Sequence, residues 1–200
     1  MQKESIKLFL TLLFIIITQG VSMADEEKIL AFGDSITFGY GAEPSKSYPA
    51  QLQLLSHKKV INAGIPGENS TDGLERLKKI LQKSNDFKTI IICHGANDIL
   101  HHSSMKKLTQ NIQAMVKLSK SKGVNVLLIG VVNFDLQNLK TLALYEKIAK
   151  EEQTVYNGTV LQKIEAIPQL KSDFVHPNAK GYKLMANEIY LSLQKAGFLK

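Results

Sequence analysis

Apolar runs alternate with helical patterns along most of this 200-residue chain, and this alternation restricts its fold more than any other feature. Short apolar runs with the character of buried strands are each followed by a segment with apolar residues at helical spacing. The predicted strands are residues 28–32, 60–63, 89–93 and 124–129, with a short fifth strand at 159–161. Near-continuous apolar strands suit a parallel sheet that is covered on both faces. We therefore predict an α/β fold, a three-layer α/β/α sandwich with a five-stranded, mostly parallel sheet.

The helical segments between these strands have recognisable starts and ends. Pro49 suits the first turn of a helix, and Gly123 suits the position after a helix end. The predicted helices are residues 47–56, a segment that Thr71 or Asp72 caps, residues 104–120, residues 138–154, and a last helix from Pro177 or Asn178 to Lys195. Ligands of open parallel sheets bind at the carboxyl ends of the strands, so functional residues are expected there.

The first 24 residues differ from the rest of the chain. Lys3 and Lys7 precede an apolar run at residues 8–17, and small residues lead up to Ala24. This pattern is typical of a secretory signal peptide, and the run is shorter than the ~20 residues that a membrane span needs. We expect cleavage after Ala24, a periplasmic or secreted protein, and one domain over residues 25–200. An uncleaved anchor is the alternative.

Charge and cysteine content exclude several kinds of function. The formal net charge is +7, but Arg76 is the only arginine, and no basic block alternates with aromatic residues. Nucleic-acid binding is therefore not expected. Cys93 is the only cysteine and lies in an apolar run, which predicts a small buried side chain. The spacing of His94, His101 and His102 does not fit a metal site, so we place them in loops around the cleft.

Three strand ends carry residues that suit acyl transfer. Ser35 follows the first strand in the sequence Gly-Asp-Ser, and it is a candidate nucleophile. Gly64 and Asn97 follow the second and third strands. In the common strand order 2-1-3-4-5 these strands are neighbours, so the three residues should converge. Attack on an ester creates an oxyanion, which the N–H groups of Ser35 and Gly64 and the Asn97 amide can bind. Gly64 has no Cβ to keep a substrate away.

The serine also needs a base, and His176 is the best candidate of five histidines. It lies three residues after Asp173 and directly before Pro177, in a loop that enters a helix. Asp173 can accept a hydrogen bond from the imidazole and leave the other ring nitrogen free for the serine proton. Each feature alone has an ordinary structural explanation, such as a turn or a helix cap. Their joint occurrence favours a catalytic site. Asp34 is predicted to be a structural acceptor for nearby backbone N–H groups, and Asp98 to cap the segment after Asn97.

Four blocks of the chain resemble the SGNH hydrolases, also called the GDSL esterase/lipase family. The blocks are residues 29–37 (ILAFGDSIT), 60–67 (VINAGIPG), 95–98 (GAND) and 173–178 (DFVHPN). The resemblance implies a flavodoxin-like SGNH hydrolase fold for residues 25–200 and no cofactor or metal. It also implies a catalytic triad of Ser35, Asp173 and His176, and an oxyanion hole of Ser35, Gly64 and Asn97.

Within this family, the short length, the signal peptide and the sequence Gly39-Tyr40-Gly41 are most similar to the bacterial periplasmic branch. That branch implies a carboxylic ester or thioester substrate, as for acyl-thioesterases, arylesterases and lysophospholipases. We therefore expect a monomeric secreted esterase with a small-molecule or lipid acyl ester as substrate. Two alternatives stay open, a carbohydrate O-acetyl esterase on the same catalytic set and a non-catalytic binding module. Pro66 and His94 depart from the usual family pattern.

Overall fold

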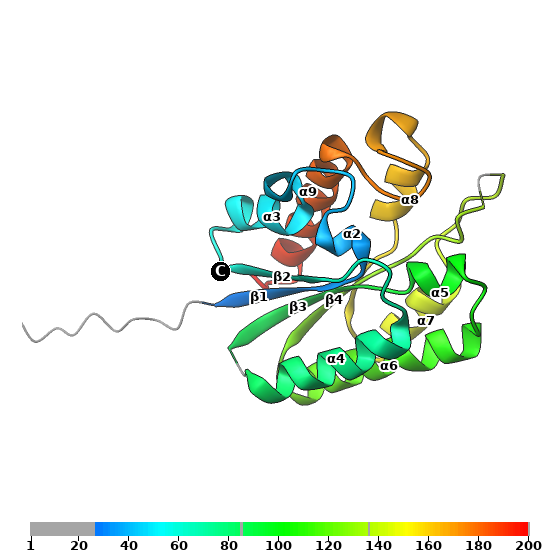
Figure 1. Cartoon of the computed structure of the whole chain (residues 1–200). Coiled ribbons are helices and arrows are strands. Elements are labelled where there is room, and N and C mark those ends of the chain that lie inside the picture. Colours follow the sequence, from blue (N-terminus) through cyan, green and yellow to red (C-terminus); the bar gives the residue numbers. More distant parts are fainter. Residues whose placement is uncertain (1–26, 85, 136, 200) are drawn as a thin grey trace, which may run out of the picture.

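A five-stranded sheet forms the centre of the protein (Figure 1). The computed structural model describes residues 27–84, 86–135 and 137–199, so the predicted signal peptide and its cleavage site lie outside the described residues. The strand order is β2-β1-β3-β4-β5, and every neighbouring pair is parallel. The strands are β1 (Lys28–Gly33), β2 (Val60–Gly64), β3 (Phe87–Cys93), β4 (Asn125–Ile129) and β5 (Val155–Asn157). The predicted fold class is confirmed.

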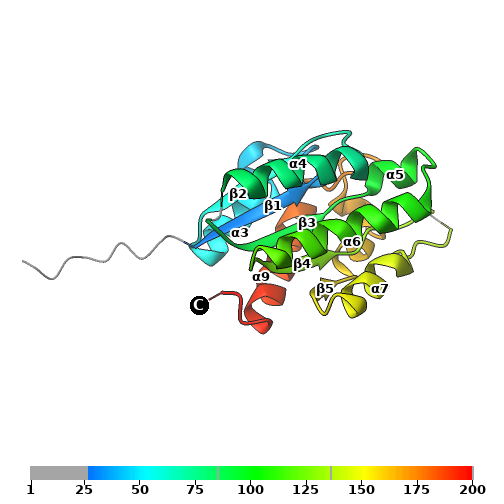
Figure 2. The same cartoon turned by 90° about the horizontal axis from the view of Figure 1, so that it is seen from below.

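Helices cover both faces of this sheet and make it the middle layer of three (Figures 1 and 2). One face is covered by α3 (Tyr48–Ser56), α8 (Val160–Glu165) and α9 (Ala179–Lys195). The other face is covered by α4 (Ser70–Lys83), α6 (Met105–Ser121) and α7 (Ala143–Glu151). Two short helices, α2 (Ser35–Phe38) and α5 (Ala96–Leu100), begin just beyond the carboxyl ends of β1 and β3, and two 3-10 turns lie at Pro44–Lys46 and Pro168–Leu170.

Burial explains why the strands read as continuous apolar runs. In β3 every residue except Lys88 is buried, and in β4 every residue except Asn125 is buried, because helices cover both sides of these strands. Cys93 is 1% exposed and lies within this core, as predicted. Within residues 27–84, 86–135 and 137–199, no helix is both long enough and apolar enough to cross a membrane.

The start of α4 differs from the prediction. This helix begins at Ser70, and its cap is Asn69 rather than Thr71 or Asp72. The Asn69 side chain accepts hydrogen bonds from the backbone N–H groups of Thr71 and Asp72 at 2.9 and 3.1 Å. Asn, Asp, Ser and Thr all cap helices well, so adjacent residues of these types leave the starting position open from sequence alone.

The fifth strand was predicted at the wrong residues. Residues 159–161 enter helix α8, and the strand lies earlier, at Val155–Asn157. The Asn157 side chain accepts hydrogen bonds from the N–H groups of Thr159 and Val160, both at 3.1 Å, and so starts the helix directly after the strand. Helix α7 is also shorter than the predicted 138–154. The chain leaves it at Glu151 and turns at Gln153, which has a φ of +48°.

Candidate active site

Ser35 lies at an abrupt change from strand to helix. Strand β1 ends at Gly33, and Ser35 is the first residue of α2. The Asp34 carboxylate accepts a hydrogen bond from the N–H of Ile36 at 3.1 Å, so this residue is the structural acceptor that we expected. Asp34 is only 1% exposed, and this burial raises the pKa of its carboxyl group. The turn holds the Ser35 hydroxyl at the carboxyl end of the central strands.

The hydroxyl of Ser35 meets the imidazole of His176. The distance from Ser35 Oγ to His176 Nε2 is 2.9 Å, and His176 Nδ1 lies 2.8 Å from Asp173 Oδ2. Because an ionised carboxylate only accepts hydrogen bonds, Nδ1 carries the hydrogen, and Nε2 is left to accept the hydrogen of the serine hydroxyl. The pKa of Asp173 is lowered overall. Burial opposes this shift, but hydrogen bonds from the N–H groups of Val175 and His176 and from the imidazole outweigh the effect of burial.

A loop carries Asp173 and His176 across the sheet to β1. Strand β5 lies at the far edge, but α9 packs against α3 on the face that also carries α2. The loop before α9 is therefore brought back over the carboxyl end of β1. A backbone hydrogen bond within the loop stabilises it, since the Ser172 N–H donates to the His176 carbonyl at 2.9 Å. The Tyr40 ring also packs on the His176 ring, with centroids 4.6 Å apart.

A buried ion pair anchors the base of the same loop. Lys171 Nζ lies 2.6 Å from Glu165 Oε2, and the two side chains are 10% and 2% exposed. The Lys171 ammonium also donates a hydrogen bond to the Phe174 carbonyl at 2.5 Å. Burial raises the pKa of Glu165 although Lys171 opposes this shift. Both ends of the segment that carries Asp173 are thus fixed to the body of the protein.

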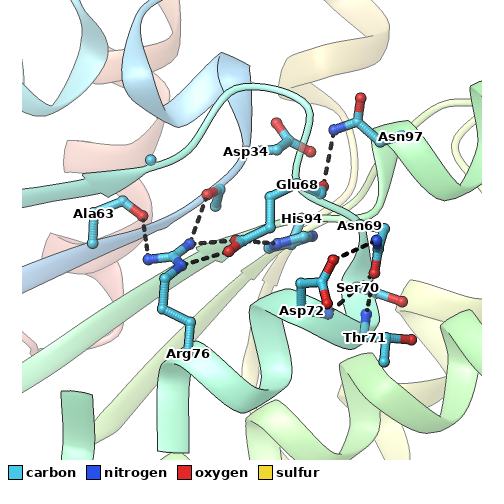
Figure 3. A network of polar contacts seen from close by, with 12 residues as sticks. Asp34, Ala63, Glu68, Asn69, Ser70, Thr71, Asp72, Arg76, His94 and Asn97 are labelled. Carbon is cyan, nitrogen blue, oxygen red and sulfur yellow. Dashed lines mark hydrogen bonds and ion pairs between the residues drawn. The ribbon is translucent and has the colours of Figure 1, made fainter. Parts of the chain in front are cut away.

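Asn97 lies on α5, close to the loop that follows β2. Its side-chain amide donates a hydrogen bond to the Glu68 carbonyl at 2.9 Å (Figure 3). An amide NH₂ group has two hydrogens, so this contact leaves one hydrogen for a substrate. Gly95 precedes the helix with a φ of +113°, a backbone conformation that residues with a side chain rarely adopt. The structure thus brings Asn97 to the same strand ends as Ser35.

The structure changes the argument for Gly64. Its N–H donates a hydrogen bond to Asn62 Oδ1 at 3.0 Å, so an oxyanion must displace Asn62 before it can use this group. A Cβ at Gly64 would overlap the backbone of Phe38 rather than obstruct a substrate, which corrects the reason given for a glycine here. Gly67, on the same loop, was not predicted as a site residue. It has a φ of +78°, and its N–H has no acceptor among the described residues.

A cluster of charged side chains lies beneath these loops (Figure 3). Arg76 donates hydrogen bonds to both carboxylate oxygens of Glu68, at 2.7 and 2.5 Å. The same guanidinium donates to the carbonyls of Ala63 and Gly33 at 2.9 and 3.2 Å, and so ties the ends of β2 and β1 together. His94 Nε2 lies 3.0 Å from Glu68 Oε2. Burial alone raises the pKa of Glu68, but Arg76 and His94 together lower it to about 2.

The three loop histidines have different positions. His101 and His102 are exposed after α5, where we expected residues around the cleft. His94 is fully buried, so its predicted place at the rim was wrong. Asp98 does not cap the segment after Asn97, contrary to the prediction. It lies within α5, and its carboxylate accepts hydrogen bonds from both the N–H and the hydroxyl of Ser70, at 2.8 and 2.6 Å. It therefore joins the start of α4 to the segment that carries Asn97.

Replacing Glu68 with glutamine should remove a specific pH dependence of stability. The folded pKa of about 2 lies below the ordinary value of 4.5, so the carboxylate stabilises the fold above pH 4.5. This contribution, on the order of 3 kcal/mol, is lost as the pH falls from 4.5 toward 2. As the pH falls through this range, the melting temperature should therefore decrease more steeply for the wild type than for Glu68→Gln.

Glu75→Gln, on α4 next to Arg76, is the matched control. The Glu75 side chain is 59% exposed, and its partner Lys78 is exposed as well, so solvent screens the pair. This variant should follow the wild-type curve. Equal pH slopes for the wild type and Glu68→Gln would contradict the argument.

The fold and the site together define a class of protein. A serine beside an imidazole, at the carboxyl ends of a doubly covered parallel sheet, is an arrangement suited to ester-bond hydrolysis. The sequence profile of the GDSL-like Lipase/Acylhydrolase family matches residues 31–184, so the chain belongs to this family, that of the SGNH hydrolases. It is an ester-bond hydrolase with similarity to esterases and thioesterases.

Relatives and solved structures agree with this assignment. An arylesterase of Vibrio mimicus is 31% identical over 84% of this chain and 89% of its own length. The thioesterase 1/protease 1/lysophospholipase L1 of Escherichia coli is 27% identical over 92% of this chain and 90% of its own. The esterase EstA from Pseudoalteromonas sp. superposes with a TM-score of 0.75 at 27% identity, over 84% of this chain and 97% of EstA.

Proposed function

We propose that this protein hydrolyses carboxylic esters or thioesters through a Ser35–His176–Asp173 triad and an acyl-enzyme. The observation that carries the proposal is the unbroken hydrogen-bonded chain from Ser35 Oγ to His176 and on to Asp173, with distances of 2.9 and 2.8 Å. A serine hydroxyl is a weak nucleophile until a base accepts its proton, and His176 Nε2 is in position to do so. The carboxylate holds the imidazole in the tautomer that this step requires.

The reaction has two halves. Ser35 Oγ attacks the carbonyl carbon while its proton moves to His176 Nε2, and Asp173 stabilises the resulting imidazolium. Collapse of the tetrahedral intermediate breaks the bond to the alcohol or thiol, which takes the proton from His176 and leaves an acyl group on Ser35. Water then attacks this acyl group while its proton moves to His176. The bond between the acyl carbon and Ser35 Oγ breaks, His176 returns the proton to Ser35 Oγ, and the carboxylic acid is released.

The charge of the intermediate needs donors that are fixed in advance. We assign this role to the Ser35 N–H, the Asn97 amide and a backbone N–H of the loop after β2. Gly64 is the donor that we predicted, and it serves if the oxyanion replaces Asn62 Oδ1. The N–H of Gly67 on the same loop, which has no acceptor within the part of the chain that the structure describes, is the second option.

Exposed apolar side chains favour an acyl substrate. Four of the largest exposed hydrophobic residues follow or lie beside the site residues in the chain, and each is 42–53% exposed: Phe38, Tyr40, Ile65 and Phe174. Such a group of aromatic and aliphatic side chains offers contacts to an acyl chain or an aryl leaving group. The names of the relatives, arylesterase and thioesterase/lysophospholipase, support the same substrate class. Secretion after cleavage at Ala24 and a monomeric state stay predictions.

A serine-directed probe and a panel of esters test the proposal together. A fluorophosphonate should label one site, at Ser35, since this reagent needs an activated serine, and EstA has been solved inhibited by monoethylphosphonate. With p-nitrophenyl esters from acetyl to dodecanoyl, turnover should extend beyond acetyl because the apolar side chains contact longer acyl groups. Activity confined to acetyl would favour the O-acetyl esterase instead. Absence of labelling in a folded sample would contradict the serine mechanism.

A further inference from the structure

His94 is a polar residue at a fully buried position of the core. It follows β3 directly, is 0% exposed, and its ring stacks on Phe32 with centroids 5.8 Å apart. Its other side faces Gly73, where a Cβ would overlap Nε2. The ring has one polar partner among the described residues, Glu68 Oε2, and its Nδ1 has none. A buried polar atom without a partner destabilises the folded state, so a histidine at this position is expected to have a function that offsets this loss.

The contact of His94 leads to Asn97 by way of Glu68 (Figure 3). The Glu68 side chain is 7% exposed and is held by Arg76 from one side and by His94 from the other. The carbonyl of the same residue accepts the hydrogen bond of the Asn97 amide at 2.9 Å. His94 and Asn97 are also joined by three peptide bonds through Gly95. The two contacts to Glu68 therefore close a ring that links the end of β3, the loop after β2 and the start of α5.

We propose that His94 is a positioning residue that acts through Glu68 to fix the direction of the Asn97 amide. This inference rests on the proposed role of Asn97 in binding the oxyanion. Hydrogen bonds weaken steeply with misalignment, and the oxyanion exists only after attack on the carbonyl. Loss of the His94 contact should therefore lower kcat and leave KM nearly unchanged, which a general loss of structure would not do.

Four enzymes form the test: the wild type, His94→Leu, Asn97→Ala and the double variant. Loss of one oxyanion donor should lower kcat by about 10²–10³-fold in Asn97→Ala. A misplaced donor is less harmful than an absent one, and His94→Leu should lower kcat by about 10–100-fold, with KM within about twofold of the wild type. If His94 acts through Asn97, the double variant should be no slower than Asn97→Ala alone.

A matched pair of amide variants separates positioning from packing. The variant His94→Gln places an N–H near the position of Nε2 and should keep most of the wild-type kcat. Asparagine is too short to reach Glu68 and should behave like leucine, and it replaces leucine in the cycle if His94→Leu does not fold. Leu81→Ala, at the far end of α4, is the control for lost stability, since Leu81 is buried away from the site. It should leave kcat unchanged well below its melting temperature.

Each outcome decides a separate claim. If Asn97→Ala is slow but the leucine and asparagine variants at position 94 keep the wild-type kcat, the inference on His94 is overturned and the proposed function stands. Multiplicative losses in the double variant would also overturn it, because His94 would then act independently of Asn97. If Asn97→Ala itself keeps the wild-type kcat, the oxyanion assignment fails, and the inference on His94 fails with it.

Discussion

Replacing Ser35 with alanine is expected to lower kcat for p-nitrophenyl esters by at least about 10⁴-fold while the protein stays folded. Among the described residues, Ser35 Oγ is the only nucleophilic group in contact with His176 Nε2, and so the only one in position to form the acyl intermediate. Loss of one hydroxyl from a side chain at the start of α2 removes no large packing contact. The measurements are steady-state hydrolysis, fluorophosphonate labelling and thermal unfolding.

Ser121→Ala is the control for this change. Ser121 is the last residue of α6, and its exposed hydroxyl donates only to the Leu118 carbonyl. This variant should keep wild-type turnover and labelling. Ester hydrolysis at a wild-type rate by pure, folded Ser35→Ala would show that another group is the nucleophile.

Replacing His176 with alanine should have an effect close to that of losing Ser35, again at least about 10⁴-fold in kcat. Without Nε2, no group of residues 27–84, 86–135 and 137–199 lies at hydrogen-bond distance from the Ser35 hydroxyl to accept its proton and return it to the leaving group. Fluorophosphonate labelling should disappear as well, although the Ser35 hydroxyl is still present. Labelling is therefore the readout that identifies His176 as the activating base.

Asp173→Ala is the informative comparison for His176→Ala. Asp173 orients the imidazole but does not touch Ser35, and its side chain is 45% exposed, so water can replace part of its contact with Nδ1. Its kcat should fall by a smaller factor than that of His176→Ala, and slow labelling should persist. Equal and complete loss of labelling in both variants would contradict this division of roles.

Local signals were sufficient for most of the fold. The strands β1 to β4 were predicted within two residues of their observed bounds, because most positions of these strands carry apolar residues. The last helix starts after Asn178, whose side chain accepts hydrogen bonds from the N–H groups of Lys180 and Gly181. The fifth strand was misplaced, since a three-residue edge strand has too few residues to show a period.

Some residues of the site were predicted from the sequence, and others were missed. Ser35, Asn97, Asp173 and His176 were each predicted from a motif at a strand end or helix start, and the structure places all four at the carboxyl end of the sheet. Gly64 had a suitable position in the sequence, but only coordinates could show that Asn62 occupies its N–H. The charged cluster was missed, because Glu68, Arg76 and His94 have no short motif in common.

The sequence by itself determined the alternation of the main strands and helices, the chemical types of the site residues and their positions at a strand end or a helix start. Hydrophobic periodicity, helix caps and turn residues act over a few neighbours, so they can be read from a local window. The tertiary structure decided which of these groups meet. Ser35 and His176 lie 141 residues apart and come within 2.9 Å only because α9 packs beside α3. Glu68 joins Arg76, His94 and Asn97 for the same physical reason, since contacts between distant segments depend on how the layers pack.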